Sequence, residues 1–515
     1  SRGLGDVYKR QLVNMVASLV NFAVSVGIGL VLTPYIVRSI GAEAYGFVGL
    51  ANTFVSYAQL LTIALNSVAG RFITVAYHEG DDSKANGYYS STLAANGVMV
   101  AVLVVVAVPV VTFLDRLVNI SPHLVGDVKA LFVFIFLNFM LSTIATVYSV
   151  ATFVKNKLYL SSIANLVFSL VRVVVMVTLF GILPPKVYYV GLAVCLGTAV
   201  MSLMNRSYTR RLLPDISFDK KSVSWASIRE MLAAGVWNVV TKLQQIMMFG
   251  LQLLVANLMV SPYLMGMLSI AQTVPNQISG LMGTVSSLFY PEQTKYYAQG
   301  KHKELVEDLK SGMKVSGFFT NIIFVTLLIA GYDFMNLWQH GQDTGLLYQL
   351  LTLTMLGLLV SGVATTLQNL PLIVNRLRRY SIGWLVYSAV SMVVLIAFIG
   401  ILPKWGVFLV AAIPPLFEIL ANVTFVPIYA SRCLGIGKFE FYPIYIRYVA
   451  STAVAAAVCW GIRHVFALVA NGWVSLIATC CLYALVTMLL DVLLLLGKKE
   501  RSMLVGMLRR KLHIG

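Results

Sequence analysis

Charged residues are scarce in this sequence. Asp, Glu, Lys and Arg make up 11% of 515 residues, whereas soluble globular proteins carry roughly 25%. Hydrophobic residues reach 59%, and the mean hydropathy is +0.83. So little polar surface cannot cover a water-soluble core of this size. The composition therefore predicts an all-α polytopic membrane protein.

Residue patterns that carry chemistry are also lacking. The sequence has five cysteines, and four of them lie in apolar segments, so neither a disulfide framework nor a metal-ligand spacing follows. It has no Gly-rich lysine loop to hold nucleotide phosphates. We therefore expect no catalytic centre, no metal and no cofactor, and a protein that is not an enzyme. The net charge of +18 indicates basic loops against anionic membrane lipid and no nucleic-acid partner.

The chain does contain an internal sequence repeat. Residues 156–184 align with residues 375–403 at a constant offset of 219, and 14 of the 29 positions are identical. The matches include Asn156 with Asn375 and Ser169 with Ser388. A repeat inside an apolar chain is typical of transporters, whose sites lie between the repeats.

Apolar segments predict fourteen membrane spans, because a span needs about 20 apolar residues. The predicted spans are residues 12–36, 46–69, 88–113, 128–152, 158–181, 188–205, 231–258, 263–290, 311–331, 347–372, 381–401, 406–430, 446–466 and 472–497. Basic residues separate across this topology, with 26 Lys and Arg in the even-numbered loops and tail and 6 in the odd-numbered loops. Basic loops stay in the cytoplasm, so both termini are predicted to be cytoplasmic.

The repeat and the span count together predict the architecture. Six spans separate the two copies, and an even number gives both copies the same orientation. We therefore expect two parallel six-helix repeats plus two extra helices. The predicted divisions are a non-native segment at residues 1–11 that resembles translated sequencing-adapter sequence, an N-terminal six-helix bundle at 12–205, a cytoplasmic linker at 206–230, a C-terminal six-helix bundle at 231–430, helices 13 and 14 at 431–497, and a basic cytoplasmic tail at 498–515.

Ionisable residues inside predicted spans are candidate functional residues, because burying a charge in a membrane is costly. Arg172 and Lys242 lie at similar depths in spans assigned to opposite bundles. One interpretation is a cationic cavity that holds an anionic group such as a diphosphate. The other is an internal salt bridge of either cation with Glu418, which is also a candidate proton- or sodium-linked carboxylate. Asp491 lies outside the repeat and is interpreted as a peripheral or structural charge.

Further candidates surround these charges. Arg71 and Lys314 lie near cytoplasmic span ends, where snorkelling also accounts for a basic residue. Amides are numerous in the first two spans of each bundle, among them Asn21, Asn52 and Gln245. Most amides in membrane helices join helices to one another. So many of them also suit a hydrated cavity with partners for sugar hydroxyls.

The segment Thr33–Gly46 reads TPYIVRSIGAEAYG. This segment and the arrangement of six, six and two spans resemble the polysaccharide-transporter branch of the multidrug/oligosaccharidyl-lipid/polysaccharide exporter superfamily. The resemblance implies a flippase in the bacterial cytoplasmic (inner) membrane. It would move undecaprenyl-diphosphate-linked oligosaccharides, such as O-antigen or capsule repeat units, to the periplasmic leaflet. It also implies alternating access through a V-shaped cationic cavity, coupling to H⁺ or Na⁺, and association with other polysaccharide-assembly proteins.

Two other classes of protein remain alternatives, and so does a lipid scramblase without energy coupling. A cation-coupled multidrug exporter of the same superfamily usually has twelve helices and an acidic cavity, whereas fourteen helices and a basic cavity are predicted here. A membrane polysaccharide polymerase or ligase should carry a large external loop with Arg or His. The predicted loop at residues 332–346 holds Asp333, His340 and Asp343 but is short.

Overall fold

The computed structural model describes residues 2–287, 289–497 and 500–501. These residues form helices joined by short loops and contain no strand, which confirms the all-α prediction. The chain divides into two compact units, residues 1–266 and residues 267–515. The predicted basic tail at 498–515 lies outside the described residues except for Glu500 and Arg501. The other predicted divisions stay predictions.

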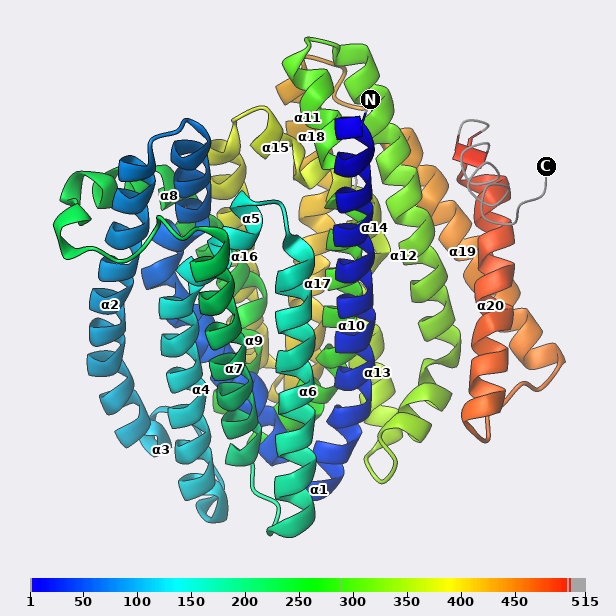
Figure 1. The fold of residues 1–515 in the computed structure, drawn as a ribbon. Coiled ribbons are helices and arrows are strands. Elements are labelled where there is room, and N and C mark those ends of the chain that lie inside the picture. Colours follow the sequence, from blue (N-terminus) through cyan, green and yellow to red (C-terminus); the bar gives the residue numbers. More distant parts are fainter. Residues whose placement is uncertain (1, 288, 498–499, 502–515) are drawn as a thin grey trace. The chain divides into compact units, whose positions relative to one another are not determined.

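The first unit consists of long helices that run side by side (Figure 1). Its elements are α1 (Arg2–His78), α2 (Asp82–Thr112), α3 (Leu114–Leu117), η1 (Pro122–Leu124), α4 (Val125–Ala145), η2 (Thr146–Ser149), α5 (Val150–Val154), α6 (Leu158–Ile182), α7 (Tyr188–Leu212), η3 (Lys220–Ser222), α8 (Trp225–Gln245), η4 (Ile246–Gly250) and α9 (Gln252–Met259), and α10 (Pro262–Ser287) begins in it.

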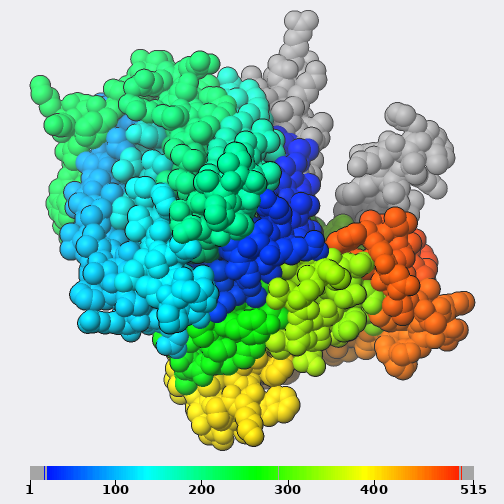
Figure 2. All heavy atoms as spheres, turned by 90° about the horizontal axis from the view of Figure 1, so that it is seen from below, coloured from blue at the N-terminus to red at the C-terminus, as the bar shows by residue number. Residues whose placement is uncertain are grey.

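The second unit also consists of helices that pack against one another. It contains most of α10 and the following elements: α11 (Tyr290–Ala298), α12 (His302–Trp338), α13 (Thr344–Met355), α14 (Leu358–Gln368), α15 (Leu370–Ile373), α16 (Leu377–Ile401), η5 (Pro403–Trp405), α17 (Gly406–Leu420), η6 (Ala421–Phe425), α18 (Val426–Leu434), α19 (Tyr442–Val465) and α20 (Trp473–Leu494). In Figure 2 the orange segments of α19 and α20 lie against the lime-green segment near the end of α12, and both helices pack on α12.

The helix α1 contains two of the predicted spans. The chain bends at Gly41, whose φ of 85° and ψ of 162° depart from helical values. A positive φ is readily reached only by glycine. The bend turns the chain back, so that the predicted spans 12–36 and 46–69 become two arms of one element.

The internal repeat is visible in the helix bounds. Helix α6 (Leu158–Ile182) and helix α16 (Leu377–Ile401) begin and end at the same offset of 219 residues. The residues two positions before each helix, Asn156 and Asn375, both have a positive φ, at 52° and 55°. Asparagine tolerates this conformation better than other residues with a β-carbon. The two copies therefore share a turn as well as a helix.

The number of spans is not confirmed by helix length and composition. Eleven helices of the described residues are long and apolar enough to cross a membrane, or twelve if α8 and α9, which are bent by 41°, form one span. The element α1 enters this set as one helix despite its bend at Gly41, and α10 is not in the set. Each of the fourteen predicted segments overlaps a helix. The chain is a multi-pass membrane protein, and its count of fourteen spans stays a prediction.

The segment that connects α7 to α8 is hydrogen-bonded to α2. Because α7 extends to Leu212 and α8 begins at Trp225, only residues 213–224 connect them. Asn86 Oδ1 accepts from the Ser217 amide at 3.0 Å, and Ser91 Oγ accepts from the Ser224 amide at 2.9 Å. Within the loop, hydrogen bonds from the Lys221 amide and the Ser222 side chain hold the pKa of the Asp219 carboxyl below its usual value. The linker is thus attached along α2.

Candidate substrate site

Arg172 lies in the middle of α6 and is half-buried. Its guanidinium carbon lies 5.9 Å from the centroid of the Phe168 ring, one helical turn earlier. Its Nε is buried and has no hydrogen-bond partner in the part of the chain that the structure describes. No carboxylate of the described residues pairs with it either. A cation–π contact offsets only part of the cost of burying a guanidinium.

The position of Arg172 follows from the packing of α6 on α1. Met176 and Phe180, four and eight residues after Arg172, belong to one buried cluster with Leu32 and Ile36 of α1. Residues four apart share one face of a helix. Packing of Met176 and Phe180 against α1 thus fixes the rotation of α6 about its axis. Arg172 lies on the same face of α6 as these two residues.

Lys242 lies in α8, four residues before the π-helical segment η4 (Ile246–Gly250). It is half-buried, and its side chain forms no hydrogen bond or ion pair with any described residue. π-helical turns inside α-helices occur often at functional sites. The bend of 41° between α8 and α9 follows directly after η4. Lys242 is therefore a solitary cation next to an irregular part of its helix.

Close contact with α1 positions α8. A β-carbon built on Gly235 would stand 1.7 Å from the Ala64 carbonyl oxygen, so the two backbones nearly touch. One turn further along α8, Asn238 Nδ2 donates to Ser67 Oγ at 2.8 Å. Arg172 and Lys242 consequently belong to the same compact unit, although the repeat assigns their spans to opposite bundles.

Arg71 lies on the surface near the end of α1 and borders a small polar pocket of about 180 Å³. Its guanidinium carbon is 5.6 Å from the centroid of the Phe72 ring. The pocket is also lined by Lys84, Glu79 and Glu230. The pocket thus brings together charges of both signs and is not purely cationic.

The structure gives Lys314 a partner. Its Nζ lies 3.1 Å from Glu500 Oε1, and both side chains are largely buried. Glu500 also accepts from the Gly497 amide at 2.8 Å through its other oxygen. The charge of Lys314 is thus compensated by an ion pair, whereas the side chains of Arg172 and Lys242 have no ion-pair partner among the described residues.

Glu418 lies near the end of α17, directly before the π-helical segment η6. It forms no ion pair among the described residues. Its carboxylate packs against Gly357, at the two-residue interruption between α13 and α14. The backbone of Leu356 and Gly357 keeps helical dihedral angles, and the Gly357 carbonyl accepts from the Ser361 amide at 3.0 Å, so α13 and α14 continue each other as one span.

The three amide candidates do not share one environment. Asn21 is half-buried, and Asn52 and Gln245 are exposed. Asn52 Nδ2 donates to Val48 O of its own helix at 2.9 Å. Other amides of the first unit join helices: Asn96 Nδ2 of α2 donates to Asn66 Oδ1 of α1 at 3.0 Å. Part of the amide signal is therefore interhelical packing, as in most membrane proteins.

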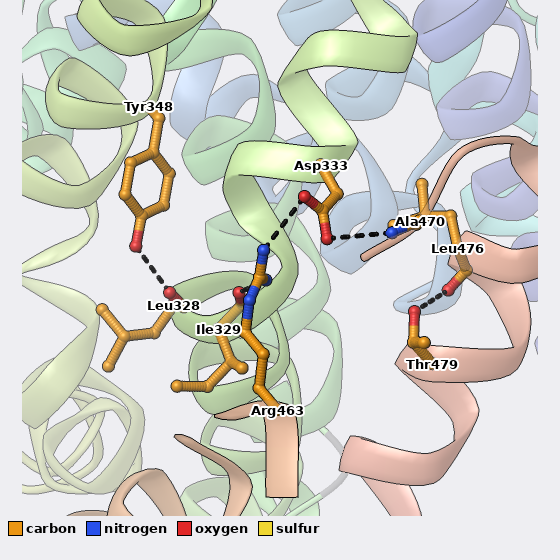
Figure 3. A network of polar contacts seen from close by, with 8 residues as sticks. All are labelled: Leu328, Ile329, Asp333, Tyr348, Arg463, Ala470, Leu476 and Thr479. Carbon is orange, nitrogen blue, oxygen red and sulfur yellow. Dashed lines mark hydrogen bonds and ion pairs between the residues drawn. The ribbon is translucent and has the colours of Figure 1, made fainter. Parts of the chain in front are cut away.

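A buried ion pair in the second unit was not predicted as one. Arg463 Nη2 of α19 lies 3.0 Å from Asp333 Oδ1 of α12, and Arg463 Nη1 donates to Ile329 O (Figure 3). The Ala470 amide donates to Asp333 Oδ2 at 3.4 Å. The sequence places Asp333 in a loop at 332–346, but α12 continues to Trp338. That expectation is wrong because the polar residues at this helix end are compensated by α19.

Comparison with known proteins decides the family. The model of the family described as polysaccharide biosynthesis protein matches residues 12–296. The "Uncharacterized membrane protein EpsK" of Bacillus subtilis (strain 168) is 30% identical over 500 residues, which cover 97% of this chain and 98% of that protein. This chain belongs to the polysaccharide biosynthesis protein family. The predicted polysaccharide-transporter branch is thereby confirmed.

Solved structures show the fold of this family member. The lipid II flippase MurJ in an inward closed conformation is similar with a TM-score of 0.69 at 13% identity, over 94% of this chain and 98% of that chain. An inward-facing multidrug resistance MATE family transporter of the MOP superfamily is similar with a TM-score of 0.61 at 13% identity, over 81% of this chain and 94% of that chain. The fold is that of membrane transporters, as the sequence predicts.

Proposed function

We propose that this protein is a flippase that moves an undecaprenyl-diphosphate-linked oligosaccharide from the cytoplasmic to the periplasmic leaflet by alternating access. Membership of the polysaccharide biosynthesis protein family supports the saccharide part of the substrate. The likeness of the fold to a lipid II flippase supports the transport part. One observation carries the proposal furthest: Arg172 and Lys242 are half-buried cations of one compact unit, and neither has an anionic partner among the described residues.

A diphosphate is the ligand that suits these two cations. A guanidinium forms paired hydrogen bonds to phosphate oxygens, whereas a lysine ammonium acts as a mobile point charge. The free Nε of Arg172 supplies a donor with no other use. In this proposal Arg71 receives the headgroup at the cytoplasmic end, and Asn21, Asn52 and Gln245 contact sugar hydroxyls. The ion pair of Lys314 with Glu500 leaves Lys314 the weakest member of the predicted set.

Energy coupling is assigned to Glu418. No nucleotide-binding loop is present in the sequence, so we propose that an H⁺ or Na⁺ gradient drives transport. Glu418 carries a carboxylate that packs against Gly357, and it has no cation partner in the described part of the chain. A carboxylate at such a place can bind and release a cation during each cycle.

The location belongs to the same proposal. The excess of basic residues in even-numbered loops supports cytoplasmic termini in a bacterial cytoplasmic membrane. Export of a lipid-linked repeat unit would place the protein next to the enzymes that build and polymerise the polysaccharide, and we propose these as partners.

Complementation tests the proposal. The intact gene is placed in a flippase-null host, and surface polysaccharide is measured for Arg172→Ala, Lys242→Ala and the double variant after membrane levels are matched. Each single variant should lower export by roughly tenfold or more, since a lost charge–phosphate contact is worth about 1.5–3 kcal/mol. The variant Lys129→Ala is the control, because Lys129 is a cation paired with Asp115 at a helix end and should keep export.

The charge itself is tested by Arg172→Lys and Lys242→Arg, which should retain part of the export. If the intact gene restores export and both alanine variants match it, the diphosphate site does not include these residues. If the intact gene fails with several sugar types but lowers drug accumulation in the host, the multidrug-exporter alternative replaces the flippase.

A further inference from the structure

The carboxyl of Asp491 in α20 is completely buried between α12 and α19. Its Oδ1 accepts two hydrogen bonds, one from Asn321 Nδ2 of α12 at 2.7 Å and one from Ser451 Oγ of α19 at 2.5 Å. Asn321 and Ser451 are also fully buried. These three side chains, named here the α20 cluster, belong to the second compact unit and take no part in the proposed substrate site.

The α20 cluster has two acceptors and no donor for them. Asp491 Oδ2 and Asn321 Oδ1 are both buried and have no hydrogen-bond partner among the described residues. The other polar atoms of the same two side chains, Asn321 Nδ2 and Asp491 Oδ1, are already hydrogen-bonded to each other at 2.7 Å. Each orphaned acceptor in a buried place costs about 1–3 kcal/mol, and more when it is charged. One positive centre placed between the two oxygens would satisfy both.

No side chain supplies that positive centre. Of the described residues on α12, α19 and α20, no Lys, Arg or His pairs with Asp491, and two cations of these helices have other carboxylate partners. Lys314 of α12 pairs with Glu500, and Arg463 of α19 pairs with Asp333. Tyr448 of α19 interacts electrostatically with Asp491, but its buried hydroxyl forms no hydrogen bond with a described residue, and a neutral phenol does not balance the charge of a carboxylate.

We propose that the α20 cluster binds one monovalent cation, a proton or Na⁺, between Asp491 Oδ2 and Asn321 Oδ1. A proton on Oδ2 would donate to the amide oxygen and close a paired acid–amide contact. A sodium ion would take both oxygens as ligands, since carboxylate and amide oxygens suit hard cations. Both sources supply the same single positive charge, and solution conditions separate them.

The bound cation would stabilise the packing of α19 and α20, which correspond to the two predicted extra helices, against α12. Asn321 belongs to α12, Ser451 to α19 and Asp491 to α20, so the α20 cluster joins the consecutive helices α19 and α20 to α12, which lies much earlier in the chain. An empty site leaves an uncompensated buried carboxylate, which favours separation of α20 from α12. Occupancy therefore sets how firmly α19 and α20 are attached.

Thermal unfolding of the purified full chain in detergent tests the site. The unfolding midpoint is measured from roughly 1 mM to roughly 100 mM NaCl with choline chloride in balance, and separately from about pH 8 to about pH 5.5. A ligand that binds only the folded state raises the midpoint as its concentration rises. We expect a rise of several degrees with Na⁺ if sodium is bound, or with falling pH at constant Na⁺ if a proton is bound.

The variant Asp491→Asn isolates the α20 cluster. Its amide nitrogen can donate to Asn321 Oδ1 without a cation, so the protein should fold and should lose the dependence on Na⁺ or pH. Ser451→Ala keeps the carboxylate and should shift the concentration or pH of half-maximal effect, which covers the case of a poorly folding Asp491→Asn. The control Asp333→Asn removes a different buried carboxylate, that of Asp333 in α12. It should lower the midpoint, because it breaks the pair with Arg463, and it should keep the dependence on Na⁺ or pH.

The proposal is overturned if parent and Asp491→Asn respond equally to Na⁺ and to pH. It is also overturned if the response disappears in Glu418→Gln and persists in Asp491→Asn, because the cation would then sit at the proposed coupling residue. Neither result depends on transport, so the test is independent of the flippase proposal.

Discussion

The backbone of Gly357 lies against the carboxylate of Glu418. A β-carbon built on Gly357 would stand 2.1 Å from Glu418 Oε2 and 3.0 Å from its carboxyl carbon. The first distance is shorter than a real β-carbon contact, so the carboxylate in this position occupies space that a side chain at residue 357 would need. The position of Glu418 is thus decided by a residue 61 positions earlier in the chain.

Gly357→Ala should therefore displace the Glu418 carboxylate and lower polysaccharide export. Overpacking of this kind costs about 1–3 kcal/mol, so the unfolding midpoint should fall as well. Shortening the acid in Gly357→Ala/Glu418→Asp should recover part of both. Gly400→Ala in α16 is the control, because nothing lies within 4 Å of its added β-carbon. Equal behaviour of the Gly357 and Gly400 variants would contradict the packing account.

Gly235→Ala should be among the most destabilising single-methyl additions in the first unit. The atom it meets is the Ala64 carbonyl oxygen at 1.7 Å, and backbone cannot rotate away as a side chain can. We expect α8 to shift from α1 and the unfolding midpoint to drop by several degrees. Gly181→Ala in α6 adds the same methyl into open space and should be neutral or slightly stabilising. A neutral Gly235→Ala would show that α8 does not pack this closely.

Removing one partner of the Asp333–Arg463 pair should cost more than removing both. The pair is mostly buried, with side-chain exposures of 7% and 21%, and breaking a buried pair costs about 3–5 kcal/mol because one charge is left uncompensated. Asp333→Asn and Arg463→Leu should each lower the unfolding free energy, and the double variant should lose less than the sum. Additive losses in this double-mutant cycle would argue against direct coupling of the pair.

Asn257→Ala should weaken the contact between α9 and the loop after α3. Asn257 and Asn119 exchange three hydrogen bonds of 2.8, 3.0 and 2.9 Å, and the Asn257 side chain forms two of them. Each is worth about 0.5–1.5 kcal/mol, so a drop of several degrees in the unfolding midpoint is expected. Thr112→Ala is the control, since its hydroxyl bonds only to Val108 O of its own helix and is exposed. A matching effect of both variants would exclude a special role for the asparagine pair.

The helices could be predicted largely from the sequence, because apolar length and repetition are local properties. The repeat at an offset of 219 reappears as the identical bounds of α6 and α16. The break between the first two spans was also predictable, and Gly41 is the residue that allows it. The family followed from the same local features and was confirmed by comparison.

The candidate site was predictable only in part. The sequence shows that Arg172, Lys242, Glu418 and Asp491 lie within apolar helices, but a charge in a helix does not reveal its partner. Lys314 is paired with Glu500 across 186 residues, and Asp333 with Arg463 across 130. Gly331 shortly before Asp333 favours a loop at this point, and only the structure shows that α12 continues to Trp338.

The sequence by itself determined that the chain is helical, repeated and built for a membrane, since these properties depend on residue type and spacing along the chain. Only the tertiary structure decided which buried polar groups are compensated and which are not. The α20 cluster brings Asn321, Ser451 and Asp491 together from three helices. Hydrogen bonds and ion pairs act over a few ångströms in space, and the chain supplies their partners from positions that no local pattern connects.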